Sequence, residues 1–240
     1  MTQNLKKFLL FPFFCSALLI DATYSSENVH FSTDEHTIIT DRLIIRPLKL
    51  TDIEPWYKEM GEHSSNPFWD TSQTLDDVTK NFKTEFLPCF EQSWRHFPFG
   101  RHAVTIKNTN EYIGQIHFDF YLDQHGLTEL SYSINKAHRK KGYCSEAIQG
   151  MLLHIKRHIG SNFSTVKDYN RDLNGELTCE LYPAKKFNGI WARVKHDNIA
   201  SLEIAKRYLN AGGYNAKTKD RLFFYGAGID TTINPMEDSD

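Results

Sequence analysis

Hydrophobic and polar residues alternate over Leu127–Ile134, and helical spacing replaces this alternation after residue 142. Alternation is typical of a strand with one buried face, whereas apolar residues three or four positions apart are typical of a helix. The positions expected to face the core are Ile148, Met151, Leu152, Ile155 and Ile159, and those expected to face away are Gln149, His154, Lys156 and Arg157. The pattern therefore predicts a strand, a turn and a helix.

The turn between this strand and this helix is basic. Arg139, Lys140 and Lys141 precede Gly142, and Ser145 follows in the first helical turn. The first N–H groups of a helix have no partner within it and lie at the positive end of its dipole, so they favour a phosphate. Glycine permits close approach of a ligand, and a serine here can cap the helix or bind a phosphate oxygen. An anion site is one interpretation, and an ordinary helix start is the other.

The segments before the turn predict a strand, two helices and a hairpin. Leu43–Ile45 favours a strand, and Thr51 with Glu54 forms a capping box for the first helix. Thr74 would cap the second helix, and Pro88 would end or kink it. The residues expected to face inward are Ile53, Trp56, Tyr57 and Met60 in the first helix, and Leu75, Val78, Phe82 and Phe86 in the second. Residues 101–107 and 111–122 form the predicted hairpin.

The second strand of this hairpin has two different faces. Its apolar face holds Gly114, Ile116, Phe118 and Phe120, and its polar face holds Gln115, His117, Asp119 and Tyr121. A half-buried antiparallel strand needs a polar face, so we expect the second face to be solvated. The alternative is that His117 and Asp119 face a bound acceptor molecule.

A long polar connection, residues 161–188, separates the helix after the basic turn from the next strand, 189–194. A connection of this length is either functional or disordered. We expect an insertion that carries a small hairpin, which could act as a lid. A last helix, 197–209, would be capped by Asp197, and a last strand covers 221–226.

The N-terminal segment resembles a secretory signal. Lys6 and Lys7 precede the apolar run 8–20, which is shorter than the roughly 20 apolar residues that a membrane-spanning helix needs. We therefore expect a leader at 1–24, a linker at 25–37, one domain at 38–228 and an acidic tail at 229–240, with no integral membrane span. The alternative is an apolar appendage or a wrongly assigned start, so the compartment stays open.

Composition excludes some functions. Lys and Arg number 28 against 30 Asp and Glu, so no overall basic field favours nucleic acid. None of the cysteines has Cys-x-x-Cys spacing, which argues against a zinc site. A pair between Cys89 and Cys179 stays an open alternative.

The motifs of the chain resemble the GNAT superfamily of N-acetyltransferases. Residues 139–144 resemble its diphosphate-binding loop, and 142–147 are similar to the branch that acetylates ribosomal-protein N-termini, the RimJ/RimL-like enzymes. Three further elements follow the order of the family: the opening Thr40–Leu48, the strand at Gly114–Ile116, and Asp197–Ser201. Cys144 replaces the usual glycine or alanine, but it is also small.

This resemblance implies a mixed α/β fold with a mostly antiparallel, twisted sheet of about six to seven strands, flanked by about four helices. The sheet would be splayed where CoA binds. The first two helices would line the acceptor groove, where the rings of Phe90, Trp94, Phe97 and Phe99 could either shape the acceptor site or belong to the core.

The resemblance also implies an enzyme that transfers an acetyl group from acetyl-CoA to a primary amine by direct attack in a ternary complex, without a metal. The acceptor would be a protein N-terminus or a small polyamine or aminoglycoside. A cationic acceptor would need an acidic groove, for which Asp119, Glu129, Asp168 and Asp172 are candidates. The alternative is a non-catalytic CoA-binding or secreted interaction protein on the same scaffold.

The implied cofactor-binding residues lie in three elements. They are Ser133 and Ile134 on the strand; Arg139, Lys140, Lys141, Gly142, Tyr143, Cys144 and Ser145 at the turn; and Asn198 and Ser201 on the last helix. Glu129 is the candidate general base. In this family the general acid is often a tyrosine seven residues after the asparagine that corresponds to Asn198. This chain has Ala205 at that position. Tyr208, one helical turn further on, is the candidate substitute, and core packing is its alternative role.

Overall fold

The structure is a computed structural model that describes residues 29–31, 36–62, 74–87, 99–119, 121–171, 177–215, 218–226 and 229. The predicted leader, almost all of the predicted tail, Cys89, Pro88, the rings at 90, 94 and 97, Phe120 and Asp172 lie outside these ranges. Within the described part of the chain, no helix is long and apolar enough to cross a membrane.

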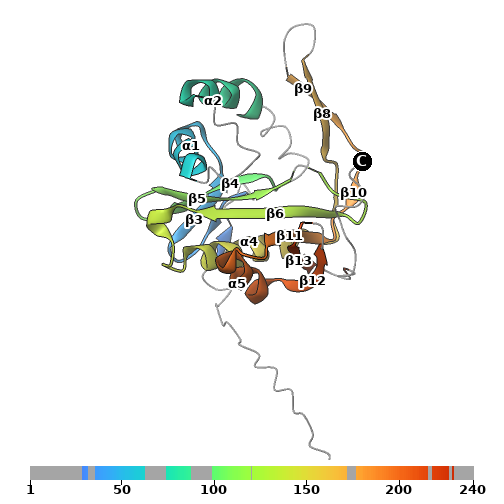
Figure 1. Ribbon diagram of the computed structural model, residues 1–240. Helices are drawn as coiled ribbons and strands as arrows, with labels where there is room; N and C mark the ends of the chain where they lie inside the picture. The colour runs from blue at the N-terminus through green and yellow to red at the C-terminus, as the bar shows by residue number, and fades with distance from the viewer. Residues whose placement is uncertain are drawn as a thin grey trace, which may run out of the picture.

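One nine-stranded sheet, in the order β1-β2-β3-β4-β5-β6-β11-β13-β12, forms the centre of the molecule (Figure 1). Its strands are β1 (His30–Phe31), β2 (Ile38–Ile39), β3 (Leu43–Pro47), β4 (Arg101–Ile106), β5 (Tyr112–Phe118), β6 (Leu127–Ile134), β11 (Gly189–Lys195), β12 (Asn210–Asn215) and β13 (Asp220–Gly226). Every neighbouring pair is antiparallel except β6 and β11. The predicted mostly antiparallel sheet is thus confirmed, and the two-residue strands β1 and β2 extend it within the segment expected to be a linker.

Helices cover both faces of the sheet. Helix α1 (Ile53–Glu62) follows the short 3-10 turn η2 (Leu50–Asp52), and α2 (Leu75–Asn81) continues into the π-helical turn η3 (Phe82–Phe86). On the opposite face lie α4 (Tyr143–His158), which follows the 3-10 turn η4 (Lys136–His138), and α5 (Ile199–Tyr208). Figure 1 shows α1 and α2 above the sheet and α4 and α5 below it. We call these two sides the α1 face and the α4 face.

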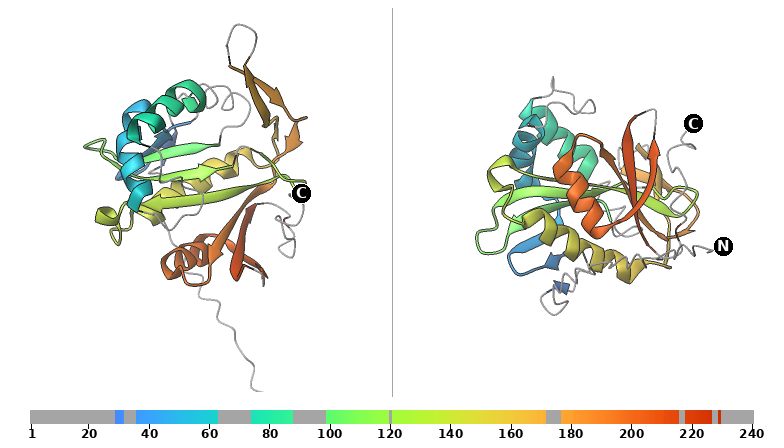
Figure 2. Two further views of the ribbon diagram at one scale, coloured as in Figure 1. Left: turned by 45° about the horizontal axis from the view of Figure 1, so that its top comes forward. Right: turned by 60° about the horizontal axis from the view of Figure 1, so that its bottom comes forward.

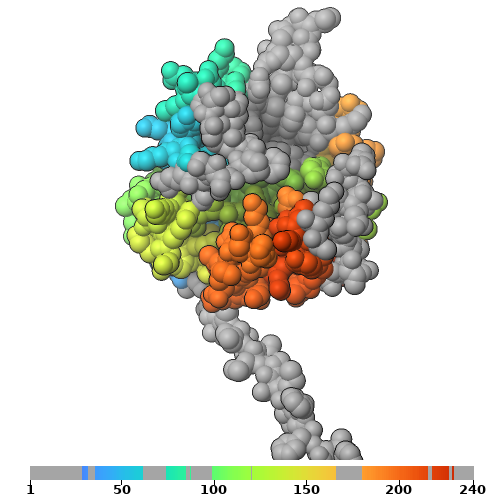
Figure 3. Space-filling model, in the orientation of Figure 1, coloured from blue at the N-terminus to red at the C-terminus, as the bar shows by residue number. Residues whose placement is uncertain are grey.

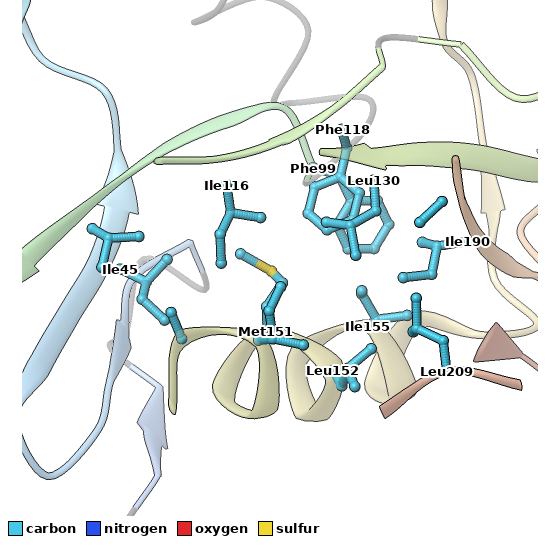
Figure 4. Packing of buried hydrophobic residues seen from close by; sticks show 14 of the residues in the cluster. Ile45, Phe99, Ile116, Phe118, Leu130, Met151, Leu152, Ile155, Ile190 and Leu209 are labelled. Carbon is cyan, nitrogen blue, oxygen red and sulfur yellow. The ribbon is translucent and has the colours of Figure 1, made fainter. Parts of the chain in front are cut away.

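The main core lies between the α4 face and helix α4. Met151 and Ile155 point from α4 toward side chains of the sheet, including Ile116 and Leu130 (Figure 4). Full burial of such a side chain stabilises the fold by about 1.5–3 kcal/mol. Phe99 is fully buried in this same cluster. It therefore serves the core and not an acceptor site, because it lies on the side of the sheet opposite α1.

A second, smaller cluster joins α1 and α2 to the other face of the sheet; its buried members are Leu48, Ile53, Trp56, Val78, Phe82, Ala103 and Tyr112. As a result, the predicted solvation of the polar face of β5 is wrong. Gln115 is buried, and His117 and Asp119 are half-buried. The alternation of β5 was identified correctly, but where helices cover both faces of a sheet, the polar side of one strand can lie under a helix from elsewhere in the chain.

Two of the three predicted helix caps, those at Thr51 and Asp197, differ from the structure, and the third, at Thr74, agrees with it. Thr74 caps α2 as predicted, because its side chain accepts from the Asp77 N–H. The capping box of Thr51 and Glu54 is wrong: the turn begins at Leu50, and the Asp52 carboxylate accepts from the Lys49 N–H at 2.8 Å and from Arg46 Nη1 at 2.6 Å. Asp197 is also wrong as a cap, because Asn198 occupies the N-cap of α5.

The insertion carries the expected hairpin, β8 (Val166–Arg171) with β9 (Leu177–Leu181). Its base is a second small pair, β7 (Asn162–Phe163) with β10 (Lys185–Lys186). The base is fixed to the domain, since Phe187 is fully buried and Lys185 Nζ donates to the Leu122 and Asp123 carbonyls. Figures 1 and 2 show the hairpin standing away from the sheet on the side of α1 and α2.

One residue of α4 departs from its helical pattern. His154, expected to face away, is fully buried, and neither of its ring nitrogens has a hydrogen-bond partner in the described part of the chain. Its ring lies 4.7 Å from that of His158 and 5.6 Å from that of Phe99. Burial, together with nearby cationic groups that include His158, His102, Arg157 and His36, lowers the pKa of His154 to about 2. Burial likewise lowers the pKa of His102 to about 4.

These two histidines should make the fold sensitive to acid. Above the unfolded pKa of about 6.5 both states are neutral; below it the unfolded chain binds protons that the native state cannot bind. The free energy of unfolding should therefore fall below about pH 6.5, by up to about 1.4 kcal/mol per pH unit for each histidine.

Urea unfolding between pH 7.5 and 4.5 measures this effect. In His154→Leu, the free energy of unfolding should fall less steeply with decreasing pH, by the amount that the binding of about one proton contributes. His196→Gln, a change at an exposed histidine, is the control and should keep the wild-type slope. Identical slopes for wild type and His154→Leu would contradict the role of His154.

Candidate active site

The basic turn (residues 139–142) ends at the N-terminus of α4. Gly142 is its N-cap, with φ of +82°, a left-handed conformation that favours glycine. The Glu146 N–H donates to the Gly142 carbonyl at 3.1 Å. Among the described residues, no protein atom accepts from the N–H groups of residues 143–145, and Ser145 makes no capping hydrogen bond. These amides have the arrangement that binds an anion.

A buried carboxylate fixes the position of this turn. Glu146 accepts from Thr40 Oγ1 at 2.6 Å, from the Arg42 N–H at 2.8 Å and from Arg42 Nε at 2.6 Å. We call Thr40, Arg42 and Glu146 the Glu146 network. Arg42 Nη1 also donates to the Lys141 carbonyl at 3.0 Å. The first turn of α4 is thereby held against the chain that leads into β3, although 104 positions separate Arg42 from Glu146.

The three predicted cations of the turn have different surroundings. Lys140 and Lys141 are exposed, and Lys140 has a positive φ of 63°. Arg139 is exposed as well, but its Nε donates to the Ile134 carbonyl at 2.8 Å, so it folds back toward the end of β6. The Tyr143 ring lies under the Arg42 guanidinium at 4.7 Å. Burial raises the pKa of Cys144 to about 12, so its thiol stays protonated at neutral pH and is a poor nucleophile.

The sheet opens next to this turn. Strands β6 and β11 pair only from Leu127–Gly189 to Glu129–Trp191. Beyond Glu129, β6 pairs with β5 alone as far as Ile134, while β11 continues beside β13 as far as Lys195. The predicted splay is therefore present, and the β11-facing edge of residues 130–134 joins no ladder within the described chain. This edge ends at the basic turn, because Ile134 contacts Arg139.

Glu129 lies where the two strands separate, on the α1 face. Its side chain is 22% exposed, and its Oε1 lies 3.7 Å from Arg193 Nε. Burial raises its pKa to about 7; Asp119 and Asp220 add to the increase and Arg193 opposes it. Desolvation also raises the pKa of the neighbouring Asp119. A carboxylate with a pKa near neutrality can take a proton from an ammonium group.

A polar layer under α1 continues from Glu129 across the sheet. Gln115 Oε1 accepts from Trp56 Nε1 at 3.1 Å and from Arg101 Nη1 at 2.7 Å. Glu59 accepts from the Tyr112 hydroxyl and from Ser133 Oγ, each at 2.5 Å. Ser133, expected at the CoA site, is thus tied through its side chain to α1.

No sequence pattern pointed to Glu59 or Arg101 as part of this layer. The only signal for Glu59 is its place three residues after Trp56, on the same side of α1. Burial lowers the pKa of Arg101 to about 10, so it stays charged at neutral pH.

The residues expected on the last helix have clear structural roles. Asn198 Oδ1 caps α5 by accepting from the Ser201 N–H at 3.2 Å, and the Tyr132 hydroxyl donates to the Ser201 carbonyl at 3.2 Å. Figure 3 shows α5 in orange beside the yellow-green segment that contains the basic turn. Tyr208 is half-buried against the main core, about 10 Å along the helix from Ser201. Its surroundings therefore favour the packing role over the acid role.

The described residues contain no group of three or more His, Cys, Asp or Glu side chains that could hold a metal.

Comparison with known proteins identifies the family. Residues 42–208 match the acetyltransferase (GNAT) domain. N-acetyltransferase p20 of Bacillus licheniformis, itself uncharacterised, is 28% identical over 122 residues, which cover 48% of this chain and 64% of the relative. The uncharacterised N-acetyltransferase YjdG of Bacillus subtilis is 35% identical over 97 residues, which cover 40% of this chain and 51% of the relative. The chain thus spans only about half to two thirds of these relatives.

A solved structure of similar fold is RimL, a ribosomal L7/L12 α-N-protein acetyltransferase in complex with coenzyme A. Its TM-score is 0.51 at 12% identity, over 78% of this chain and 95% of the other. At this identity the likeness concerns the fold. The domain match, however, covers well over half of the sequence, and on that ground the protein belongs to the GNAT acetyltransferase family.

Proposed function

We propose that the protein is an N-acetyltransferase that moves an acetyl group from acetyl-CoA to a primary amine. The observation that carries this proposal is the continuous path from Glu129 along the open edge of β6 to the unpaired amides of residues 143–145. Five residues of strand, about 16 Å, lead from Glu129 to the end of this edge at Ile134, where the basic turn follows. An extended thiol arm fits such an edge, with its phosphates at the helix start and its thioester near Glu129.

Each part of the site has a defined task in this reaction. The amides of residues 143–145, with Lys140 and Lys141, bind the phosphates, and backbone groups of residues 130–134 align the arm. Glu129 takes a proton from the acceptor ammonium, directly or through water. The amine nitrogen then attacks the thioester carbon and the C–S bond breaks. The attacking nitrogen loses its second proton to solvent, and the thiolate takes a proton from solvent. Tyr208 is not needed for this sequence.

The charges beside Glu129 suit an acceptor with one positive charge. Asp119 and Glu129 are adjacent, but the guanidinium groups of Arg101 and Arg193 lie near them and oppose the increase of their pKa values. An acidic groove for a polyamine is therefore less well supported than a site for a single α-amino group. The β8–β9 hairpin and the helices α1 and α2 stand on the same side of the sheet (Figure 2), which suits a polypeptide between them. We therefore infer a protein N-terminus as the acceptor.

The first prediction concerns the phosphate site. Calorimetry should detect CoA binding to the wild type, and Gly142→Asp should weaken it at least about tenfold, because it adds a negative charge and a side chain at a left-handed position. Gly160→Asp is the matched control: it also has a positive φ, of 93°, but open space around its Cα. A lack of CoA binding by the wild type would rule out CoA as the cofactor. Equal binding by wild type and Gly142→Asp would show that the turn does not bind the phosphates.

The second prediction concerns Glu129. The rate kcat/KM should rise with pH through an apparent pKa of about 7, because the raised pKa leaves the carboxyl group protonated and inactive in mildly acidic solution. Glu129→Gln should lower the rate by about 10²–10⁴-fold and remove this inflection, leaving only that of the acceptor amine. Glu203→Gln, on an exposed position of α5, should keep the wild-type profile. A complete lack of turnover in the wild type with an amine panel would favour the non-catalytic alternative.

The third prediction concerns the hairpin. Replacing residues 168–179 by an Asn-Gly turn removes the projecting part and keeps the base. The KM for a peptide acceptor should rise by about tenfold, as for the loss of one substantial contact, while the KM for a small amine and the affinity for CoA should not change. Steady-state kinetics with both acceptors measure this. An equal effect on both would show that the hairpin does not select polypeptides.

A further inference from the structure

Arg42 has more hydrogen-bonding capacity than the Glu146 network uses. A guanidinium group has five N–H donors. The Nε donor goes to Glu146 and one Nη1 donor goes to the Lys141 carbonyl. The Nη2 group stands directly over the glycine of the basic turn, because a Cβ at Gly142 would lie only 3.2 Å from it. Among the described residues, three N–H donors of this fixed cation thus have no hydrogen-bond partner beside the start of α4.

The surroundings of Arg42 differ from those of a purely structural arginine. Its side chain is 48% exposed, whereas that of Glu146 is 5% exposed. Glu146 would still accept two hydrogen bonds without the guanidinium, from Thr40 Oγ1 and from the Arg42 N–H. The guanidinium also stacks over Tyr143, the first residue of α4. These contacts hold a half-exposed cation next to the same amides that the proposed phosphate site uses.

We propose that Arg42 binds a phosphate group of CoA directly, as a ligand supplied from the start of the domain, 99 positions before Lys141. This inference rests on the proposed function of the basic turn. An arginine held by a carboxylate on one edge can present its other edge to a phosphate, and the fixed side chain loses little entropy when it binds. Lys140 and Lys141 add positive charge on exposed side chains, and Arg42 adds hydrogen-bond donors in a fixed orientation.

The test compares donors with and without phosphate. In Arg42→Gln, the Kd for CoA and the KM for acetyl-CoA should rise about tenfold or more, as for the loss of a charged hydrogen bond. The KM for S-acetylpantetheine, which has no phosphate, should stay within about twofold of the wild-type value, since the arm and Glu129 are unchanged. Arg207→Gln, an exposed arginine at the end of α5, is the control.

Arg42→Lys separates binding from positioning. It keeps the charge but cannot hold the forked contacts with Glu146 and Lys141. If Arg42 binds phosphate, CoA affinity should lie between wild type and Arg42→Gln and should depend on salt more steeply than that of Arg42→Gln. Thermal melting of each variant shows whether it is folded.

Three results would overturn the inference. Wild-type CoA affinity in Arg42→Gln would show that Arg42 does not touch the ligand, and the proposed function would stand. Equal losses with acetyl-CoA and S-acetylpantetheine, or equal affinities in the lysine and glutamine variants, would show that Arg42 only positions the turn. A lack of CoA binding by the wild type would instead reject the proposed function, and the inference with it.

Discussion

The Glu146 carboxylate is the contact on which the candidate site depends. It accepts from three donors in residues 40–42 and lies at the first turn of α4, so it joins the start of the domain to its middle, where the basic turn must be rigid. Removing a buried acceptor leaves its donors without partners and costs more than the bonds themselves contribute. The anion-binding geometry of the turn is therefore a property of tertiary structure, and an isolated peptide with the same residues would not keep it.

Desolvation gives the two sides of the sheet opposite chemical characters. On the α4 face it keeps His102 and His154 neutral, and these rings act as core aromatics. On the α1 face it raises the pKa of Glu129 into the range useful for proton transfer while leaving this side chain partly exposed. The buried histidines and Glu129 differ in solvent access, because a group that titrates near neutral pH can transfer protons only if an acceptor molecule can reach it. In the proposed mechanism, partial burial therefore prepares Glu129 as the base, although Arg193 opposes the increase of its pKa.

Most of the fold was predictable from the sequence, because long alternating and helical patterns report directly on burial. The strand at Leu127–Ile134, the helix after Gly142 and the hairpin at β8–β9 all appear as expected. The errors have two causes. The burial of His154 and of the polar face of β5 depends on neighbours distant in sequence, which local periodicity cannot report, whereas the Asp52 contacts are local and were missed because Thr51 and Glu54 matched the capping pattern as well. Arg42 and Glu59 also escaped notice because their contacts are distant in sequence, although the opening motif already marked the residues around Arg42.

The splay of the sheet follows from how β11 enters it. Gly189, the first residue of β11, has a φ of 151°, and a Cβ there would lie 2.2 Å from the Tyr225 carbonyl. The strand is thus held tightly against β13 at its start, where it also pairs with Leu127 of β6. From this fixed point β11 follows β13 and β6 follows β5, so the gap widens toward α4. A residue larger than glycine would push β11 off β13 and alter the gap at its origin. The insertion ends at Asn188, next to Gly189, so the hairpin and the gap share this fixed point, and Glu129 lies two residues along β6 from it.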